Sequence, residues 1–472
     1  MQIRHFAWAL LACAAGIAGV ATSALAALQV GAVRVDQTGA FGASQSGKYD
    51  HERLHVRAIV LDNGTARAAL ISYEGATDFD IAATLKAVAG LLNCPVENVV
   101  ITHTHTHSSE AVRQLAGGQQ PAYTNPSKHI VDAVTQARAR LQPARMTYGT
   151  GASYLAVNRD AIDPVSRKWV QGSNLDAPVD RSVSVLSFLK PGGEPIAAYV
   201  GFGMHPINGF VMGVVSADYP GAMSRYVEKA FGDNVVVAFT QSASGDVNPL
   251  HLRPSNNAMA DRTGHKITGF VLDRETSEGP LRVVDMRLKA NIDTSKVKAA
   301  ADPKAIDQLF RFIESQGQLL GEEVIRVMTF SPPPTDEVRI AGKQRVVTCP
   351  GRMRTNGDAL DPGSREGTAA TYRDADPVHI NVGMLGLGTV ALTSVNGEIY
   401  TAIGLRMKSE APMRNTFVVT PANVRVRGYI VDDASYGHQT FQVLNNAMKA
   451  GCAETGIVNA VVDLQTQYLN GR

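Results

Sequence analysis

Short apolar runs that end in polar residues recur along this chain, and this recurrence constrains its fold more than any other feature. Residues 99–101 lead into a histidine-rich segment, residues 196–201 lead to His205, and residues 235–239 lead to a stretch of Gln, Ser, Gly and Asp. Runs of this length that alternate with segments of helical spacing are typical of buried strands in α/β proteins. Loops at one edge of such a sheet converge, so we expect these polar residues to lie together.

The fold class that this pattern predicts is α/β, with a mixed β-sheet core flanked by helices. We expect one domain over residues 27–472, because no linker separates the motifs, although 472 residues would also fit two or three domains. Residues 253–300 mix turn residues with short apolar runs, and we expect them to be an insertion. The other expected strands are 28–33, 56–61, 68–73, 384–393 and 417–420, and the expected helices are 81–92, 219–231, 305–327, 399–408 and 441–469.

The N-terminus has the pattern of a secretory signal. A basic start precedes an apolar stretch over residues 6–20, and Ala24-Leu25-Ala26 gives a small-residue cleavage site. The stretch is short for a membrane anchor, which needs roughly 20 apolar residues. We therefore expect residues 1–26 to be a signal peptide and the protein to be exported, either periplasmic or secreted.

Composition limits the partners and the redox chemistry. Lys and Arg number 45 against 43 Asp and Glu, and no basic run is present, so nothing indicates a nucleic-acid partner. No feature indicates a protein partner either. The mature chain keeps Cys94, Cys349 and Cys452, of which two could form a disulfide in an oxidising compartment. The sequence leaves the pairing open.

The segment from Thr102 to Ser109 carries the strongest chemical signal. His103, His105 and His107 alternate with threonines directly after the apolar run 99–101. In an extended chain alternate side chains share one face, and imidazole is a common zinc ligand. The segment therefore indicates a metal or catalytic site. It does not match the His-x-His-x-Asp-His pattern of metallo-β-lactamases, and by itself it leaves an amidohydrolase-like barrel open.

The other candidates are ambiguous when each is taken alone. A single histidine such as His205 is more often structural than a ligand. Glu398 precedes an expected helix, where a carboxylate favours the helix dipole. Tyr429 on its own is typical of a core residue.

Taken together, these segments resemble the neutral ceramidase family. The motifs that carry the resemblance occur in the family's order from about residue 30 to the C-terminus. They are Thr104-His105-Thr106-His107-Ser108, Met204-His205-Pro206, Ser216-Ala217-Asp218-Tyr219-Pro220-Gly221, Gly245-Asp246-Val247-Asn248-Pro249, Gly397-Glu398 and Gly428-Tyr429.

The resemblance implies one Zn²⁺ per chain at the strand ends, held by two histidines, a glutamate and a tyrosine. Zinc-activated water would then attack an amide carbonyl. His107 would act as a catalytic residue that moves a proton or stabilises the oxyanion, and Arg159 would orient the substrate. The implied metal ligands are His105, His205, Glu398 and Tyr429.

The chain also departs from the family pattern. Phe441 stands where ceramidases usually have a second tyrosine, and Asn248 stands where they have serine; both are expected to contact substrate. The family's C-terminal β-sandwich domain is not expected here.

The predicted function is thus exported, zinc-dependent, ceramidase-like hydrolysis of an N-acyl amide bond in a small-molecule or lipid substrate. A lipid amide would bring peripheral contact with membrane lipid. Two alternatives stay open at this point. One is a zinc esterase, lactonase or cyclic-amide hydrolase on the same site. The other is an exported metal- or ligand-binding protein without turnover.

Overall fold

The structure is a computed structural model, and residues 1–26 and the C-terminal residue 472 lie outside its described part. The predicted signal peptide and most of the predicted insertion are therefore outside the described residues. None of the described helices is long and apolar enough to cross a membrane. The described residues are 27–37, 53–75, 81–108, 126–164, 167–209, 215–263, 298, 300–356, 367, 369–423 and 428–471.

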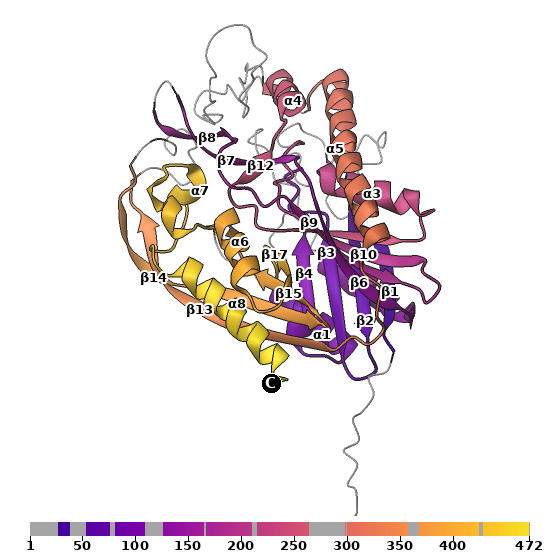
Figure 1. The fold of residues 1–472 in the computed structure, drawn as a ribbon. Coiled ribbons are helices and arrows are strands. Elements are labelled where there is room, and N and C mark those ends of the chain that lie inside the picture. The colour runs from indigo at the N-terminus through magenta and orange to yellow at the C-terminus, as the bar shows by residue number, and fades with distance from the viewer. Residues whose placement is uncertain are drawn as a thin grey trace, which may run out of the picture.

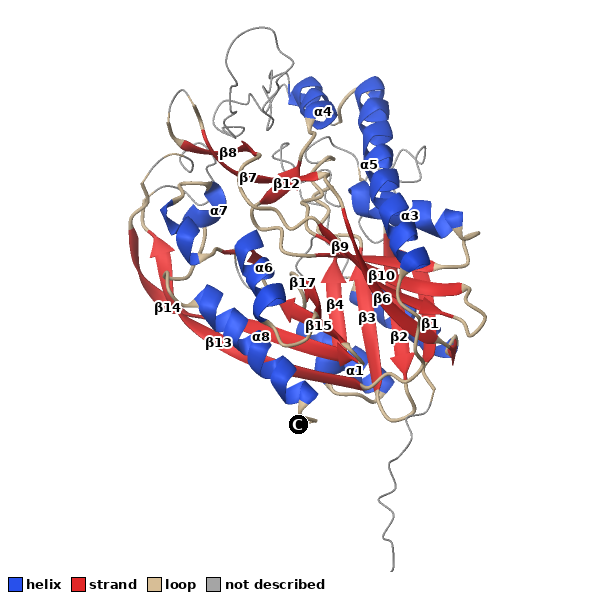
Figure 2. Ribbon diagram, viewed as in Figure 1, coloured by secondary structure: helices blue, strands red, loops and turns tan. Residues whose placement is uncertain are grey.

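Helices are interspersed with runs of consecutive strands along the chain (Figures 1 and 2). The strands are β1 Gln29–Asp36, β2 His55–Asp62, β3 Arg67–Tyr73, β4 Val99–His103, β5 Gln142–Pro143, β6 Arg145–Ala152, β7 Ala156–Ile162, β8 Trp169–Asn174, β9 Ser182–Leu189, β10 Pro195–Phe202, β11 Val236–Gln241, β12 Val247–Pro249, β13 Ile340–Arg354, β14 Tyr372–Leu387, β15 Val390–Val395, β16 Glu398–Ile399, β17 Asn415–Val419 and β18 Tyr429–Ile430. The helices are α1 Ile81–Leu92, α2 Ser127–Ala139, α3 Asp218–Ala230, α4 Arg253–Thr263, α5 Pro303–Phe330, α6 Thr401–Glu410, α7 Phe441–Leu444 and α8 Ala453–Leu469, with short 3-10 helices η3 Val96–Asn98 and η6 Asp433–Gly437.

The single mixed sheet predicted from the sequence is wrong, because the described strands form five sheets. Their orders are β4-β3-β2-β1-β5, β11-β10-β9-β6, β12-β7-β8, β13-β14-β15-β17 and β16-β18. Parallel pairs occur between β3 and β4, β10 and β11, β15 and β17, and β16 and β18. The mixed character was therefore predicted correctly, whereas the number of sheets was not.

Strand β2 illustrates why the sequence shows continuous apolar runs. Ile59 and Leu61 face a central apolar cluster, whereas Val56, Ala58 and Val60 face helices α1 and α2. A strand that is buried on both faces has no polar alternation. The sequence therefore identified this strand but could not identify the layer on either side of it.

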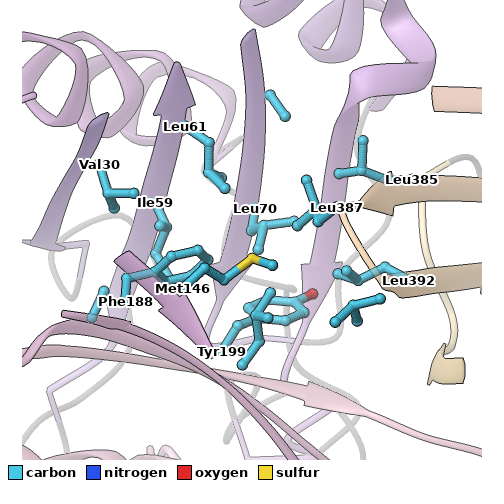
Figure 3. Close-up of a cluster of buried hydrophobic side chains, with 14 of the residues drawn as sticks. Val30, Ile59, Leu61, Leu70, Met146, Phe188, Tyr199, Leu385, Leu387 and Leu392 are labelled. Atoms are coloured by element: carbon cyan, nitrogen blue, oxygen red, sulfur yellow. The ribbon is translucent and has the colours of Figure 1, made fainter. Parts of the chain in front are cut away.

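One apolar cluster joins three of the five sheets, which are those that contain β3, β10 and β15. Leu70 of β3, Tyr199 of β10 and Leu392 of β15 belong to it (Figure 3). Burying one large apolar side chain stabilises a fold by about 1.5–3 kcal/mol, so this shared core fixes the sheets relative to one another. Thr420 N, just after β17, donates to Gln241 O at the end of β11. The C-terminal ends of strands from different sheets thus meet at one place.

Two predicted elements are divided in the structure. Residues 384–393 are not one strand, because Gly388, with φ of +58°, turns the chain between β14 and β15. Residues 441–469 are not one helix, because residues 445–452 separate α7 from α8. Apolar residues on both sides of each break led to the prediction of one continuous element.

The structure also selects one cysteine pair. Cys349 of β13 and Cys452 at the start of α8 form a disulfide, and Cys94 is free. The bridge ties helix α8 to the sheet that it covers. Because the two cysteines are 103 residues apart, only the tertiary fold could select this pair.

Candidate functional site

Four residues that the sequence singled out lie at neighbouring strand ends. His105 follows the end of β4 by two residues, and His205 follows the end of β10 by three. Strands β16 and β18 pair in parallel with Glu398 beside Tyr429. The fold thus brings together side chains from four segments that are far apart in the chain.

Three potential ligand atoms converge within this group. Glu398 Oε2 lies 3.3 Å from His105 Nε2 and 3.1 Å from His205 Nε2. Two atoms that each lie about 2.0–2.1 Å from one tetrahedral zinc ion are about 3.3–3.4 Å apart. All three side chains are buried. The spacing and chemistry of this set therefore fit zinc.

The two imidazoles are held in different ways. His205 Nδ1 donates to Val247 O at 3.0 Å, which leaves Nε2 as the atom that can bind a metal. Both ring nitrogens of His105 are buried without a hydrogen-bond partner among the described residues. Such an atom is unfavourable unless a ligand reaches it. His105 also has φ of +65°, an uncommon conformation for a residue with a side chain, which the surrounding structure must maintain.

The histidine segment is not the continuous extended chain that its alternation predicted. Strand β4 ends at His103, and the left-handed residue His105 redirects the chain. As a result, donor atoms of His105, His107 and His205 all lie within 4.8 Å of one another, whereas His103 is not in this group. The histidines are therefore a second potential ligand set, and Glu398 contacts two of them, His105 and His205.

The pKa values of the buried groups at this site are shifted in different directions. Burial, with further repulsion from His105 and His205, lowers the pKa of His107 well below its usual value, so this imidazole is neutral at pH 7. Burial alone would raise the pKa of Glu398, but the two neighbouring imidazoles hold it well below its usual range. Burial and the Glu398 carboxylate raise the pKa of Tyr429. A cation at the site would favour its phenolate form.

Arg159 of β7 lies beside Tyr429. Its guanidinium donates to Gly245 O at 2.5 Å and to Asn248 Oδ1 at 3.2 Å. Its central carbon lies 5.3 Å from the ring centroids of both Tyr429 and Phe441. The structure thus gathers all the candidate residues at one site, and it places Asn248 against Arg159.

The sequence did not identify a buried carboxylate beside this group. Asp160 accepts hydrogen bonds from Tyr400 Oη at 3.1 Å, from His438 Nδ1 at 2.9 Å and from Gln442 Nε2 at 2.7 Å. Asp160 follows Arg159, and Gln442 follows Phe441. Adjacency to the candidate residues was the only signal in the sequence, since no motif contains these partners.

Asp246 of the Gly-Asp-Val segment connects two elements near the site through hydrogen bonds. Its carboxylate accepts from the backbone and hydroxyl groups of Thr401 and from Asn158 Nδ2, each at 2.8 Å. Burial, together with the nearby Asp160, raises its pKa to about 7. Asp246 therefore ties the helix that follows Glu398 to strand β7.

Comparisons with known proteins found related sequences. The model of the neutral/alkaline non-lysosomal ceramidase N-terminal region matches residues 30–372. Neutral ceramidase from Pseudomonas aeruginosa is 30% identical over 172 residues, which are 34% of this chain and 25% of that protein. Neutral ceramidase A from Dictyostelium discoideum is 28% identical over 224 residues, which are 42% of this chain and 31% of that protein. These alignments span less than half of the relatives' own length.

Solved structures share the fold. A structure described as ceramidase complexed with C2 superposes with a TM-score of 0.64 at 17% identity, covering 94% of this chain and 76% of that one. The crystal structure of neutral ceramidase from Pseudomonas aeruginosa gives a TM-score of 0.61 at 16% identity, with coverage of 94% and 75%.

Proposed function

Because the chain belongs to the neutral/alkaline non-lysosomal ceramidase family, we propose that it is a zinc-dependent hydrolase that cleaves an N-acyl amide bond. The observation that carries the proposal is the convergence of His105 Nε2, His205 Nε2 and Glu398 Oε2 at one buried point. The relatives are called neutral ceramidases, which supports a lipid amide as the substrate class. The activity of those longer proteins is proposed for this chain.

The residues that would hold zinc are His105, His205 and Glu398, with the Tyr429 phenol as the fourth ligand. A zinc ion held there would lower the pKa of water to about 7 and polarise a carbonyl oxygen. The hydrogen bond from His205 Nδ1 to Val247 O fixes the imidazole ring, so His205 Nε2 stays directed at the site.

His107 and Arg159 would act on the substrate. The neutral His107 imidazole can accept a proton and pass it to the leaving amine. The Arg159 guanidinium is buried and anchored on two oxygens, so it can orient the acyl group without moving. Asn248 supports Arg159, and the ring of Phe441 covers it.

Phe441 sets the expected preference among amides. It has no hydroxyl to offer to a polar head group, and a site without such a partner discriminates poorly for a substrate hydroxyl. We therefore propose weaker turnover of long-chain ceramide than of another N-acyl amide.

The decisive experiment combines metal analysis with a panel of N-acyl amides. We expect about one zinc per chain, hydrolysis of at least one amide, and loss of both in Glu398→Gln, since a neutral carboxamide is a poor zinc ligand. Full zinc content in that variant would remove Glu398 from the ligand set. Zinc binding without turnover of any amide or ester would support a binding protein.

We further propose that the protein is exported. The disulfide between Cys349 and Cys452 supports this, because such bonds persist in oxidising compartments. N-terminal sequencing of the mature protein should find Ala27 as its first residue. A mature protein that retains residues 1–26 would contradict the proposed cleavage.

A further inference from the structure

Two buried side chains outside the ligand set lie between the segments that carry the two metal histidines. Gln241 is the last residue of β11, and Tyr219 is in the first turn of α3. Both side chains are fully buried. Neither has a role in the proposed chemistry, yet each contacts the backbone directly before a metal histidine.

The Gln241 carboxamide bridges the two histidine segments. Its Nε2 donates to Thr104 O at 3.1 Å, and its Oε1 accepts from Met204 N at 3.3 Å. Thr104 immediately precedes His105, and Met204 immediately precedes His205.

The Tyr219 hydroxyl completes this arrangement. It donates to Met204 O at 2.6 Å and lies 3.4 Å from Gln241 Nε2, from which it can accept. Burial raises the pKa of Tyr219 well above its usual value, so the hydroxyl keeps the proton that it donates. Both hydrogens of the Gln241 amide nitrogen, its carbonyl oxygen and the phenol proton are thereby all used.

These contacts hold the peptide group in front of each histidine at both of its ends. In the peptide before His105, Gln241 binds the Thr104 oxygen and Gly75 O accepts from His105 N at 3.1 Å. In the peptide before His205, Tyr219 binds the Met204 oxygen and Val247 O accepts from His205 N at 3.2 Å.

Fixing these peptide groups matters because a histidine ring is placed by its backbone. His105 has φ of +65°, which a residue with a side chain does not favour and which surrounding contacts must therefore maintain. If the Thr104 carbonyl were free to rotate, the chain could relax and carry the His105 ring away from His205 and Glu398.

Helix α3 is itself anchored to both segments, so Tyr219 is a fixed point. The Asp218 carboxylate accepts from Gly209 N at 3.0 Å in the segment after His205. Just before the helix, the carbonyl oxygen of Ser216 accepts a hydrogen bond from Thr106 Oγ1 at 2.9 Å. The Ser216–Gly221 motif thus contacts the loops that carry both histidines.

We propose that Gln241 and Tyr219 form a positioning pair that sets the separation and orientation of His105 and His205 for zinc binding. The inference rests on the proposed function, because it takes these histidines as zinc ligands. Neither residue of the pair touches the metal or the substrate. Both act through the backbone of Thr104 and Met204.

The test compares three variants that each remove buried hydrogen bonds at nearly constant volume. Gln241→Met and Tyr219→Phe break the pair. Tyr199→Phe is the matched control, since its buried hydroxyl bonds to Thr102 Oγ1 at 3.2 Å and contacts neither histidine-flanking peptide. Zinc affinity is measured by competition with a chromophoric chelator, and ligand geometry by the visible spectrum of the cobalt-substituted protein.

We expect Gln241→Met and Tyr219→Phe each to weaken zinc binding by about 10- to 100-fold and to alter the cobalt spectrum, as loss of outer contacts to ligands does. Tyr199→Phe should stay within about twofold of wild type in zinc affinity, even if all three variants lose similar thermal stability. Wild-type zinc affinity and an unchanged cobalt spectrum in folded Tyr219→Phe or Gln241→Met would overturn the pairing. Failure of the wild-type protein to bind zinc would instead overturn the proposed function.

Discussion

Two of the buried clusters of titratable groups in the described part of the chain contrast in how their polar atoms are partnered. In the first, Arg57 of β2 lies between Glu74 and Glu228, with nitrogen–oxygen distances of 2.5 and 2.9 Å. In the second, at the proposed zinc site, the ring nitrogens of His105 have no hydrogen-bond partner among the described residues. Arg57, Glu74, Glu228 and His105 are all almost completely removed from water.

From this difference we expect the second cluster, and not the first, to bind a ligand. Arg34 Nη1 also reaches Glu228 at 2.6 Å, so two arginines balance two carboxylates and the first cluster has no need of an ion. The histidine cluster offers several nitrogen donors and one carboxylate, a set that a divalent cation completes. A balanced cluster is therefore expected to hold the fold together, whereas an unbalanced one is expected to bind the metal.

The largest expected effect comes from removing one of the proposed metal-binding histidines. His205→Ala should lower kcat/KM by more than about 100-fold, beyond what loss of an outer contact causes, and zinc should be lost with it. The apo variant should melt no lower than apo wild-type protein by more than a few degrees, because the imidazole is held for the metal. His379→Ala on the exposed surface of β14 is the control and should keep both zinc and activity.

The reverse pattern is expected when the balanced cluster is broken. Arg57→Met should lower the free energy of unfolding by about 3–5 kcal/mol, since it leaves buried carboxylates without compensation. Denaturant titration measures this loss, and the folded fraction should retain wild-type zinc content. Arg345→Met removes an exposed pair with Asp463 and should change stability by less than about 1 kcal/mol. Equal losses in the two variants would contradict the comparison.

Acid should weaken the balanced cluster over a defined pH range. Burial opposes ionisation of Glu74, but the Arg57 guanidinium lowers its pKa from 4.5 to about 2. A carboxylate with a depressed folded-state pKa contributes stability that is fully present above the unfolded value and is lost as the pH falls through the folded value. The denaturant concentration at the unfolding midpoint of the wild type should therefore decrease as the pH is lowered from about 4.5 to about 2. In Glu74→Gln this dependence on pH should be weaker. An unchanged slope would show that Glu74 does not titrate there.

A smaller effect is expected at the substrate side of the zinc site. Phe441→Tyr adds a hydroxyl beside Tyr429 and Arg159, where ring and guanidinium already pack together. One neutral hydrogen bond is worth about 0.5–1.5 kcal/mol, so kcat/KM for ceramide should rise about two- to tenfold. The matching value for an acyl amide without a head-group hydroxyl should not rise, and an equal gain for both substrates would count against a role in head-group recognition.

No effect is expected from a serine-directed fluorophosphonate. In the described part of the chain, no hydrogen bond joins the hydroxyl of Ser242 or Ser244 to a histidine or a carboxylate, so neither serine is activated as a nucleophile. A zinc chelator should stop the enzyme under the same conditions. Stoichiometric labelling of either serine with loss of activity would overturn the metal-based mechanism.

The chain's local patterns determined a large part of this picture. Predominantly apolar runs predicted β2 and β3, because strands buried on both faces are apolar at most positions. Polar residues at strand ends predicted where the site would lie, and motif resemblance supplied the candidate ligands His105, His205, Glu398 and Tyr429. Strand β7 was missed, because its sequence carries Asn158, Arg159 and Asp160 and has no apolar run.

Only the tertiary structure decided which of these groups touch. The turn at His105, the Cys349–Cys452 pairing and the bridge from Gln241 to both histidine segments depend on residues that are brought together from distant parts of the chain. Hydrophobic periodicity is a local property, and it identifies the face that a segment buries. A hydrogen bond or disulfide between distant segments depends on how several such faces pack against one another. No single stretch of the sequence determines that packing geometry.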